Sequence, residues 1–207
     1  RHILRQDPDV VLIGEMRDSE TVDTAMKAAE TGHLLISTLH TPDATTTVAR
    51  IVAMFTPEEQ EIVRVRLADA LHAVVSQRLL RRKDGKGRVA ALEVMIVTAT
   101  IRDLILDQNR TSEIKEYIAE GREQYGMQTF DQHLMDLVQQ DVVEYEHAVA
   151  NASNPSDFEL QMRTFRRKSR MSTRAAAQPA AAPAAKPPET PQGPEGLMSD
   201  FSSLLPQ

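Results

Sequence analysis

LRQDPDVVLIGEMRD, residues Leu4–Asp18, is the stretch around which the rest of this sequence is organised. Its centre, Val10–Ile13, is an unbroken aliphatic run, which is typical of a strand buried on both faces of a parallel sheet. Gly14 and Glu15 follow at the carboxyl end of that strand, the edge where α/β sheets bind ligands. A carboxylate there is costly unless a metal ion, a water molecule or a cation contacts it. Glu15 is therefore the first candidate for chemistry.

A second strand is predicted shortly after the first. Asp18 or Ser19 can cap a helix with apolar residues at helical spacing, and Gly32 is placed to end it. HLLIST, residues His33–Thr38, then forms another short apolar run. Strand, helix and strand in this order form a right-handed βαβ unit, so the sequence predicts an α/β domain.

Polar residues follow the second predicted strand as they follow the first. His40 and Thr41 come at its carboxyl end and should share a sheet edge with Glu15. His33 stands at the start of the same strand, and a packing role and a ligand role are equally open for it. Arg17 could contact a phosphate or another subunit, or pair with a nearby aspartate such as Asp18.

The remaining pattern predicts further helices around a hairpin, followed by a low-complexity end. A helix capped by Thr41 or Asp43, a helix beginning at Thr56–Glu59 and a hairpin of His72–Arg82 and Arg88–Val97 come first. Helical spacing then covers the segment from Thr98, followed by Thr111–Gly121, Thr129–Gln140, Tyr145–Ala152 and Ser156–Arg167. We therefore expect an α/β part at 1–97, a helical domain at 98–168 and a disordered Ala/Pro-rich tail at 169–207.

Composition narrows the class of protein. A hydrophobic fraction of 41% over 207 residues is enough for a real core, and a net charge of −6 argues against a nucleic-acid partner. The absence of cysteine excludes disulfides and thiolate metal sites. Without a long apolar segment, a cytoplasmic protein is expected. The chain starts at Arg1 inside a structured pattern, so we expect it to be a fragment.

Two longer motifs identify a family. Leu4–Asp18 resembles the Walker B and Asp-box signature of the secretion ATPase superfamily, and TGHLLISTLHT, residues Thr31–Thr41, resembles its His box. The resemblance covers residues 1–165 and implies the C-terminal part of a RecA-like P-loop NTPase domain. It implies ATP and Mg²⁺ as cofactors, with Glu15 acting on the attacking water and lying near the Mg²⁺, and His40 contacting the γ-phosphate. Arg17, His33 and Thr41 are the further nucleotide-binding candidates.

The branch of the family follows from two other features. Pilus-extension and type II secretion ATPases carry a tetracysteine insertion after the segment that resembles Ser76–Arg82, and none occurs here. TIRDLI, residues Thr100–Ile105, resembles the AIRNLI motif of the retraction ATPases, the PilT family, with Asp103 in place of Asn; GMQTFD, Gly126–Asp131, resembles the same family. Besides packing in a helix core, the five residues of this motif would then serve retraction: Ile101, Arg102, Asp103, Leu104 and Ile105.

The resemblance implies a hexameric motor that hydrolyses ATP to drive type IV pilus retraction. Its implied partners are an inner-membrane pilus platform protein and a second retraction ATPase, with the motor cytoplasmic and peripheral at the inner membrane. A PilU-like accessory retraction ATPase and a non-catalytic assembly fragment are the alternatives. No G-x-x-x-x-G-K-[ST] occurs, so we expect the phosphate-binding loop to lie upstream of Arg1 and this fragment alone to be inactive.

Overall fold

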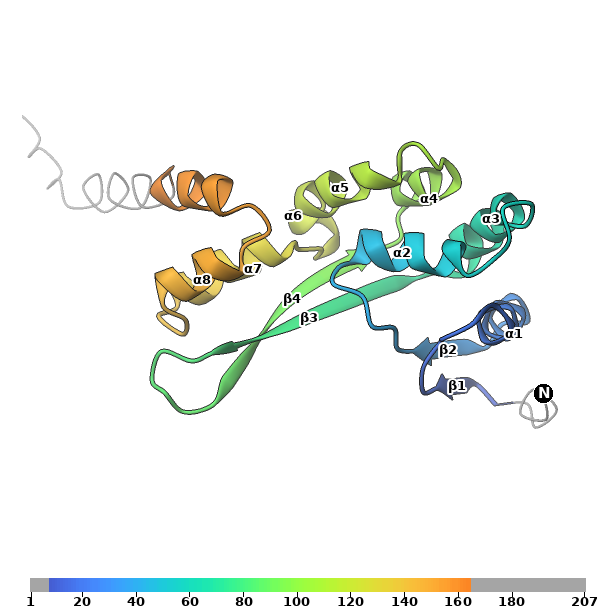
Figure 1. The fold of residues 1–207 in the computed structure, drawn as a ribbon, viewed down its shortest axis with the longest axis horizontal. Helices are drawn as coiled ribbons and strands as arrows, with labels where there is room; N and C mark the ends of the chain where they lie inside the picture. Colours follow the sequence, from blue (N-terminus) through green and yellow to red (C-terminus); the bar gives the residue numbers. More distant parts are fainter. Residues whose placement is uncertain (1–7, 165–207) are drawn as a thin grey trace, which may run out of the picture. The chain divides into compact units, whose positions relative to one another are not determined.

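The computed structural model describes residues 8–164, and its first part is a βαβ unit. Strands β1 (Val10–Ile13) and β2 (Leu34–Ser37) run parallel, in a register that pairs Val10 with Leu34 and Ile13 with Ser37. Helix α1 (Ser19–Glu30) connects them (Figure 1). The predicted βαβ unit is confirmed, and the residues that follow the two strands come to one edge of the sheet.

Local signals set both ends of α1 where the sequence predicts them. The Asp18 side chain accepts a hydrogen bond from the backbone N–H of Thr21 at 2.8 Å, so Asp18 is the cap. Gly32 follows the helix with a φ of +91°, a conformation that only glycine adopts without strain. On the inner face of the helix Val22, Ala25, Met26 and Ala28 are buried.

The prediction that β1 is buried on both faces is wrong within the described residues. Val11 is 6% exposed, but Leu12 is 72% exposed, and in β2 Leu34 and Ile36 are both more than half exposed. Each of these strands has only the other as a sheet partner among residues 8–164. Since alternate side chains point to opposite faces, the face opposite Val11 lies bare.

Two helices follow β2. Helix α2 (Ala44–Ala53) begins after Asp43, whose carboxylate accepts a hydrogen bond from Thr46 N–H at 2.7 Å. Helix α3 spans Gln60–Ala70. The sequence placed its start at Thr56–Glu59, and that prediction is wrong by several residues. The carboxylate of Glu59 accepts hydrogen bonds from the N–H and the hydroxyl of Thr56, and this holds residues 56–59 in a turn ahead of the helix.

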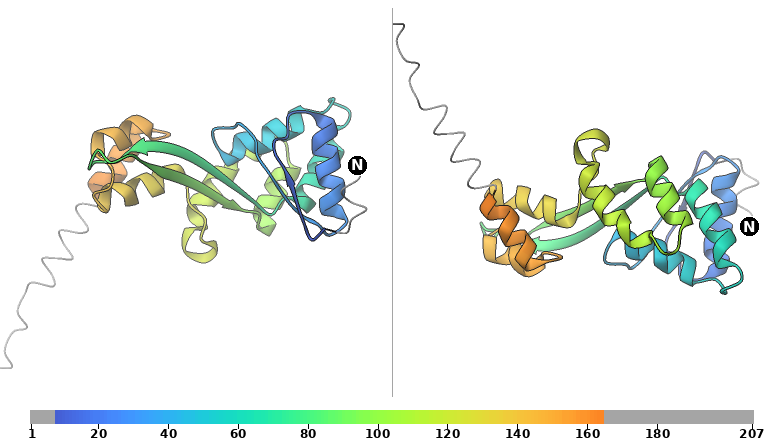
Figure 2. Two further views of the ribbon diagram at one scale, coloured as in Figure 1. Left: turned by 90° about the horizontal axis from the view of Figure 1, so that it is seen from below. Right: turned by 90° about the horizontal axis from the view of Figure 1, so that it is seen from above.

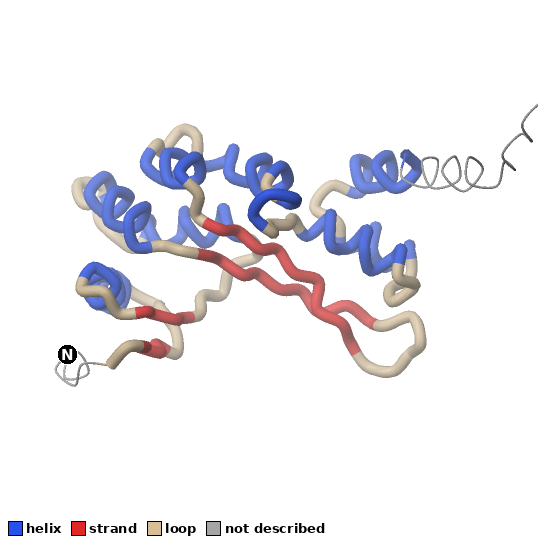
Figure 3. The backbone as a smooth tube through the Cα atoms, turned by 180° about the vertical axis from the view of Figure 1, so that it is seen from behind, coloured by secondary structure: helices blue, strands red, loops and turns tan. Residues whose placement is uncertain are grey.

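The predicted hairpin is confirmed. Strand β3 (Ala73–Arg81) pairs antiparallel with strand β4 (Arg88–Ile96) over its whole length, from Ala73 opposite Ile96 to Arg81 opposite Arg88. Figure 3 shows these two strands as a long, twisted pair of red segments. Gly85 and Gly87 take positive φ values of +69° and +90° in the connecting turn, which closes the hairpin.

The residues after the hairpin are helical, as predicted. In α7, the hydroxyl of Thr129 and the side chain of Gln132 form a reciprocal capping box. The short helix α6 was not predicted, and residues 155–164 are also helical. The labelled elements are α4 (Ala99–Leu106), the 3₁₀ turn η2 (Thr111–Glu113), α5 (Ile114–Glu120), α6 (Arg122–Tyr125), α7 (Phe130–Gln139) and α8 (Tyr145–Asn151).

Two hydrophobic clusters stabilise this arrangement, and neither follows the proposed division at residue 98. The first joins α1, α2, α3 and the end of β4 to α4 and α5; Val48, Met95 and Ile105 are fully buried in it. The second joins the other end of the hairpin, at Leu80, to α7, α8 and residues 155–164. Figure 2 shows the helices on the hairpin from two sides. The described residues all fall in one compact unit, so a boundary at 98 remains a proposal.

Within residues 8–164, no helix is both long and apolar enough to cross a membrane. The predicted tail, 169–207, lies outside the described residues.

Candidate active site

Glu15 is positioned by hydrogen bonds that tie the segment after β1 to the segment after β2. The Thr38 hydroxyl donates to the carbonyl of Gly14 at 2.5 Å, and the N–H of Met16 donates to the carbonyl of Thr38 at 3.1 Å. The two strand ends are therefore held together on both sides of Glu15. This is the carboxyl edge at which the sequence places the chemistry.

Three of the predicted site residues meet at this edge. The Glu15 carboxylate accepts from Arg17, whose Nε and Nη2 atoms lie 2.7 and 2.6 Å from Oε2. The other carboxylate oxygen, Oε1, lies 3.5 Å from Nε2 of His40. The Arg17 side chain thus pairs with Glu15 and not with Asp18, which caps α1 instead. Glu15, Arg17 and His40 form what we call the edge cluster.

The charges around Glu15 keep it ionised. The hydrogen bond from Arg17 is the main cause that lowers the pKa of Glu15. Desolvation opposes it as the next largest effect, and the charges of Arg17, His40 and Arg50 lower the pKa further. The Glu15 side chain is only 23% exposed, whereas the His40 side chain is 85% exposed. An ionised carboxylate beside an accessible imidazole can hold a water molecule and a phosphate oxygen in neighbouring positions.

Thr41 lies next to the edge cluster and is engaged in the start of α2. Its hydroxyl is 2.6 Å from the hydroxyl of Thr47, which donates to the carbonyl of Asp43 at 2.8 Å. The contacts hold the His40–Asp43 segment against the first turn of α2. The Thr41 hydroxyl is therefore engaged by Thr47 in this structure.

His33 is not brought to the edge cluster. It precedes β2, at the opposite end of the strand from His40. Its Nδ1 atom lies 3.1 Å from the carbonyl of Ala28 and 2.9 Å from the hydroxyl of Thr31, both at the end of α1. In this structure His33 joins the end of α1 to the start of β2.

The motif residues on α4 divide into a buried and an exposed set. Ile101, Leu104 and Ile105 are fully buried in the first hydrophobic cluster. Arg102 and Asp103 are exposed, and Arg102 forms an ion pair with Asp69 on α3. Only the exposed pair is therefore available to another molecule.

Sequence reasoning missed Glu93. This glutamate lies on the inner face of β4, is 3% exposed, and accepts a hydrogen bond at 2.8 Å from the N–H of Ala44, the first residue of α2. Desolvation raises its pKa, and the hydrogen bond from Ala44 opposes that rise. The alternation of β4, which points Glu93 to the same side as Ala91 and Met95, was the available signal.

Metal binding at the edge cluster is limited to one carboxylate. No group of three or more His, Asp or Glu side chains suited to a metal occurs in the part of the chain that the structure describes. Mg²⁺ usually keeps several waters and is held by one or two carboxylates together with substrate phosphates. Glu15 fits such a site as a single contributing ligand, with the phosphates supplying the rest.

The sequence matches the family described as type II/IV secretion system protein over residues 1–178. The chain belongs to this family. It is 48% identical over 151 residues to a twitching motility protein of Neisseria gonorrhoeae, covering 73% of the chain and 40% of the relative. Identity is 45% over 158 residues to the type IV pilus retraction ATPase PilT of Pseudomonas aeruginosa, covering 76% and 45%.

Two further comparisons bear on branch and fold. The type IV pilus ATPase PilU of P. aeruginosa is 41% identical over 163 residues, covering 79% of the chain and 42% of the relative. The crystal structure of the pilus retraction motor PilT with bound ADP matches with a TM-score of 0.64 and 42% identity, covering 75% of the chain and 43% of that chain. The fold is therefore that of the RecA-like secretion ATPases, and the chain spans less than half the length of these relatives.

Proposed function

We propose that this chain is the C-terminal part of a motor ATPase that hydrolyses ATP to drive type IV pilus retraction. The edge cluster carries the proposal, because it joins a low-pKa carboxylate, a guanidinium and an exposed imidazole at the carboxyl edge of a parallel sheet. The similarity to a retraction ATPase and to a retraction motor solved with ADP supports it.

The proposed reaction needs position and charge more than covalent chemistry. Water attacks the γ-phosphorus of ATP, the bond to the ADP oxygen breaks, and inorganic phosphate leaves. Glu15 orients that water through a carboxylate oxygen, and His40 donates a hydrogen bond to a γ-phosphate oxygen. Arg17 holds the Glu15 carboxylate ionised and in place. Mg²⁺ bound with the nucleotide supplies charge neutralisation on the phosphates.

The wider assembly belongs to the same proposal. Retraction would require a hexamer of the full-length protein, at the cytoplasmic side of the inner membrane, that acts on a pilus platform protein there. The chain itself contains no Walker A sequence, and its only Gly-Lys combination, Gly85–Gly87, lies in the hairpin turn. We expect this chain by itself to show no ATP turnover.

The test is Glu15→Gln in the full-length protein. Glutamine keeps the shape but cannot hold the negative charge, so turnover should fall about a hundredfold or more while nucleotide affinity is retained. Steady-state hydrolysis and equilibrium binding of a fluorescent ATP analogue measure the two quantities. Glu20→Gln, an exposed change on α1, is the control. Turnover at the wild-type level would remove Glu15 from the mechanism.

A PilU-like accessory role is the second candidate, favoured by the similarity to PilU and by Asp103 on α4. The two are separated by deleting the protein in its own cell and measuring retraction. We expect loss of a main motor to abolish retraction, and loss of an accessory motor to leave part of it.

A further inference from the structure

The tip of the β3–β4 hairpin concentrates positive charge in a chain whose net charge is −6. The strand register places Arg81 directly opposite Arg88 in the last pair before the turn. Like charges opposite each other on paired strands are destabilising. A compensating charge is therefore expected close by.

Two other cations at the turn, Arg82 and Lys83, each have an acidic partner. Arg82 forms an ion pair with Asp84 at 2.9 Å, and Lys83 forms one with Asp141 at 2.5 Å. Within residues 8–164, neither Arg81 nor Arg88 makes a side-chain hydrogen bond or an ion pair. Two positive charges are thus left unneutralised at one end of the hairpin.

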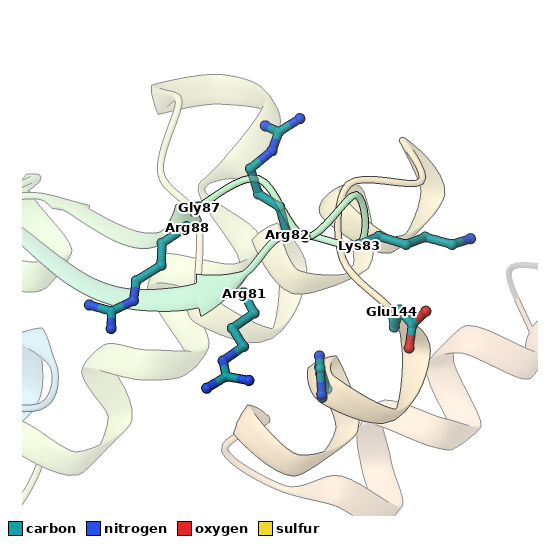
Figure 4. Close-up of a pocket in the computed structure, with 8 residues that line it drawn as sticks. Arg81, Arg82, Lys83, Gly87, Arg88 and Glu144 are labelled. Atoms are coloured by element: carbon teal, nitrogen blue, oxygen red, sulfur yellow. The ribbon is translucent and has the colours of Figure 1, made fainter.

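These two arginines line a hollow of about 420 Å³. Figure 4 shows Arg81 and Arg88 extending from their strands toward the same side of the hairpin, while Arg82 points the other way. Glu144, the acidic residue of the lining, stands apart from both in this view. The lining residues are Arg81, Arg82, Lys83, Gly85, Gly87, Arg88, Glu144 and His147.

The charge and the geometry select a class of ligand. Two guanidinium groups on one side offer paired N–H donors, which bind phosphate and carboxylate oxygens bidentately. A phosphate monoester carries about −1.5 to −2 charges near neutral pH, which balances two arginines, whereas a carboxylate balances only one. A phosphate group is therefore the better match.

We propose that the hollow at the β3–β4 turn is a binding site for a phosphate group, held by Arg81 and Arg88. The site is separate from the edge cluster and does not depend on ATP hydrolysis, since its residues lie at the turn of the hairpin and not after β1 or β2. The phosphate can come from a free phosphate monoester or from the headgroup of an anionic lipid.

The experiment compares the full-length wild-type protein with the double variant Arg81→Gln, Arg88→Gln. Lys86→Gln is the matched control, because Lys86 is an exposed cation of the same turn that does not line the hollow. Calorimetric titration with inorganic phosphate is one arm. Flotation with vesicles that contain phosphatidic acid, whose headgroup is a phosphate monoester, against phosphatidylcholine vesicles is the other. Both arms are run at one fixed salt concentration, since phosphate contacts are screened by salt.

Loss of two charge-assisted contacts should weaken binding about a hundredfold in the double variant, and Lys86→Gln should bind like the wild type. Loss in the phosphate arm identifies a free phosphate monoester, and loss in the vesicle arm alone identifies a lipid headgroup. Equal binding by the wild type and the double variant in both arms overturns the site. An equal loss in Lys86→Gln also overturns it, because the effect would then be general charge.

Folding of the double variant is checked by its Tm, which should equal or exceed that of the wild type because a repulsive pair is removed. If that variant does not fold, Arg81→Lys with Arg88→Lys replaces it. This pair keeps both charges but loses the bidentate geometry, so phosphate binding should still weaken. Wild-type binding by the lysine pair would contradict a site built on paired guanidinium groups.

Discussion

Arg17 sets the protonation of Glu15, and this gives the edge cluster a pH dependence. Its hydrogen bond is the main cause that lowers the pKa of Glu15. In Arg17→Gln the pKa of Glu15 should rise, so the carboxylate is protonated at a higher pH than in the wild type. The acid limb of the kcat/KM profile of the full-length enzyme should therefore move to higher pH.

Arg110→Gln is the matched control for this shift. Arg110 forms a comparable exposed ion pair with Glu113, away from β1 and β2. Its loss should leave the acid limb in place. If Arg17→Gln also left the limb unmoved, either Glu15 would not be the group that titrates or Arg17 would not control it.

Glu93 gives the folded state its own dependence on pH. Because burial raises its pKa above the ordinary 4.5, its contribution to stability is present below pH 4.5 and is lost as the pH rises through the raised value. Glu93→Gln keeps an acceptor for the N–H of Ala44 but cannot ionise. The free energy of unfolding of this variant, relative to the wild type, should therefore increase as the pH rises.

Urea denaturation across the acidic to neutral range measures this difference. Glu123→Gln, an exposed change in α6, removes the same charge without touching the interior. Its stability curve should run parallel to that of the wild type. A parallel curve for Glu93→Gln would mean that Glu93 has the same pKa in the folded and unfolded states, so that burial does not raise it.

The sequence predicted the place of individual residues better than their partners. Glu15 and His40 were placed at one edge because each follows a strand, and the structure brings them together. For Arg17 the sequence left open a phosphate, another subunit or an aspartate such as Asp18, and the partner in the structure, Glu15, was not among these. Glu93 was missed because its contact, Ala44, is far away in sequence. Pairings of this kind depend on tertiary packing, which local patterns do not encode.

At the scale of elements, local capping signals predicted most boundaries. Asp18 and Asp43 cap α1 and α2 because each carboxylate reaches the N–H three residues ahead. The start of α3 was mispredicted although Thr56-Pro57 is a strong signal. There the Glu59 carboxylate forms the expected bond to Thr56 within a turn that comes before the helix. The hydrogen bond between Glu59 and Thr56 can therefore form in the first turn of a helix or in a separate turn ahead of it, and the sequence does not distinguish the two.

On helix α4 the buried residue Ile105 contributes to stability, whereas the exposed residue Asp103 is available for the proposed function. Asp103 is exposed, so Asp103→Ala should change the free energy of unfolding by less than about 0.5 kcal/mol and leave ATP turnover intact. If this surface serves retraction, twitching motility should be reduced. The comparison variant is Ile105→Ala, which should cost about 2–5 kcal/mol because Ile105 is fully buried.

Motility assays and chemical denaturation of both variants test whether the exposed part of the motif serves retraction or the motif serves packing alone. Normal motility in Asp103→Ala cells that contain a normal amount of the protein would remove Asp103 from retraction. The buried residues of the motif would then be explained by packing alone.

For the whole molecule, the bare face of the β1–β2 sheet is the main departure from expectation. The pattern correctly predicted two apolar strands, but no segment within residues 8–164 packs over Leu12 and Ile36 to bury them. Local sequence cannot show which other segment would supply it. The relatives are more than twice as long as the part matched here, which is consistent with cover from elsewhere in a longer protein.

This face should make the isolated chain self-associate. Leu12→Ser with Ile36→Ser should shift the isolated chain toward the monomer in light scattering, because two large apolar side chains leave the surface. Leu160→Ser is the control, since Leu160 is 64% exposed on residues 155–164 and not on this sheet. Self-association that is unchanged by the double substitution would place the contact elsewhere.

The β3–β4 hairpin belongs to both hydrophobic clusters, with Met95 in one and Leu80 in the other. Its nine-residue strands span about 30 Å at the usual rise per residue. Glu93 also fastens this hairpin to the start of α2, a few residues from His40. The hairpin can therefore work as a lever: a small movement of the His40 segment at one end would be carried, as a rigid displacement, to the helices packed at the other.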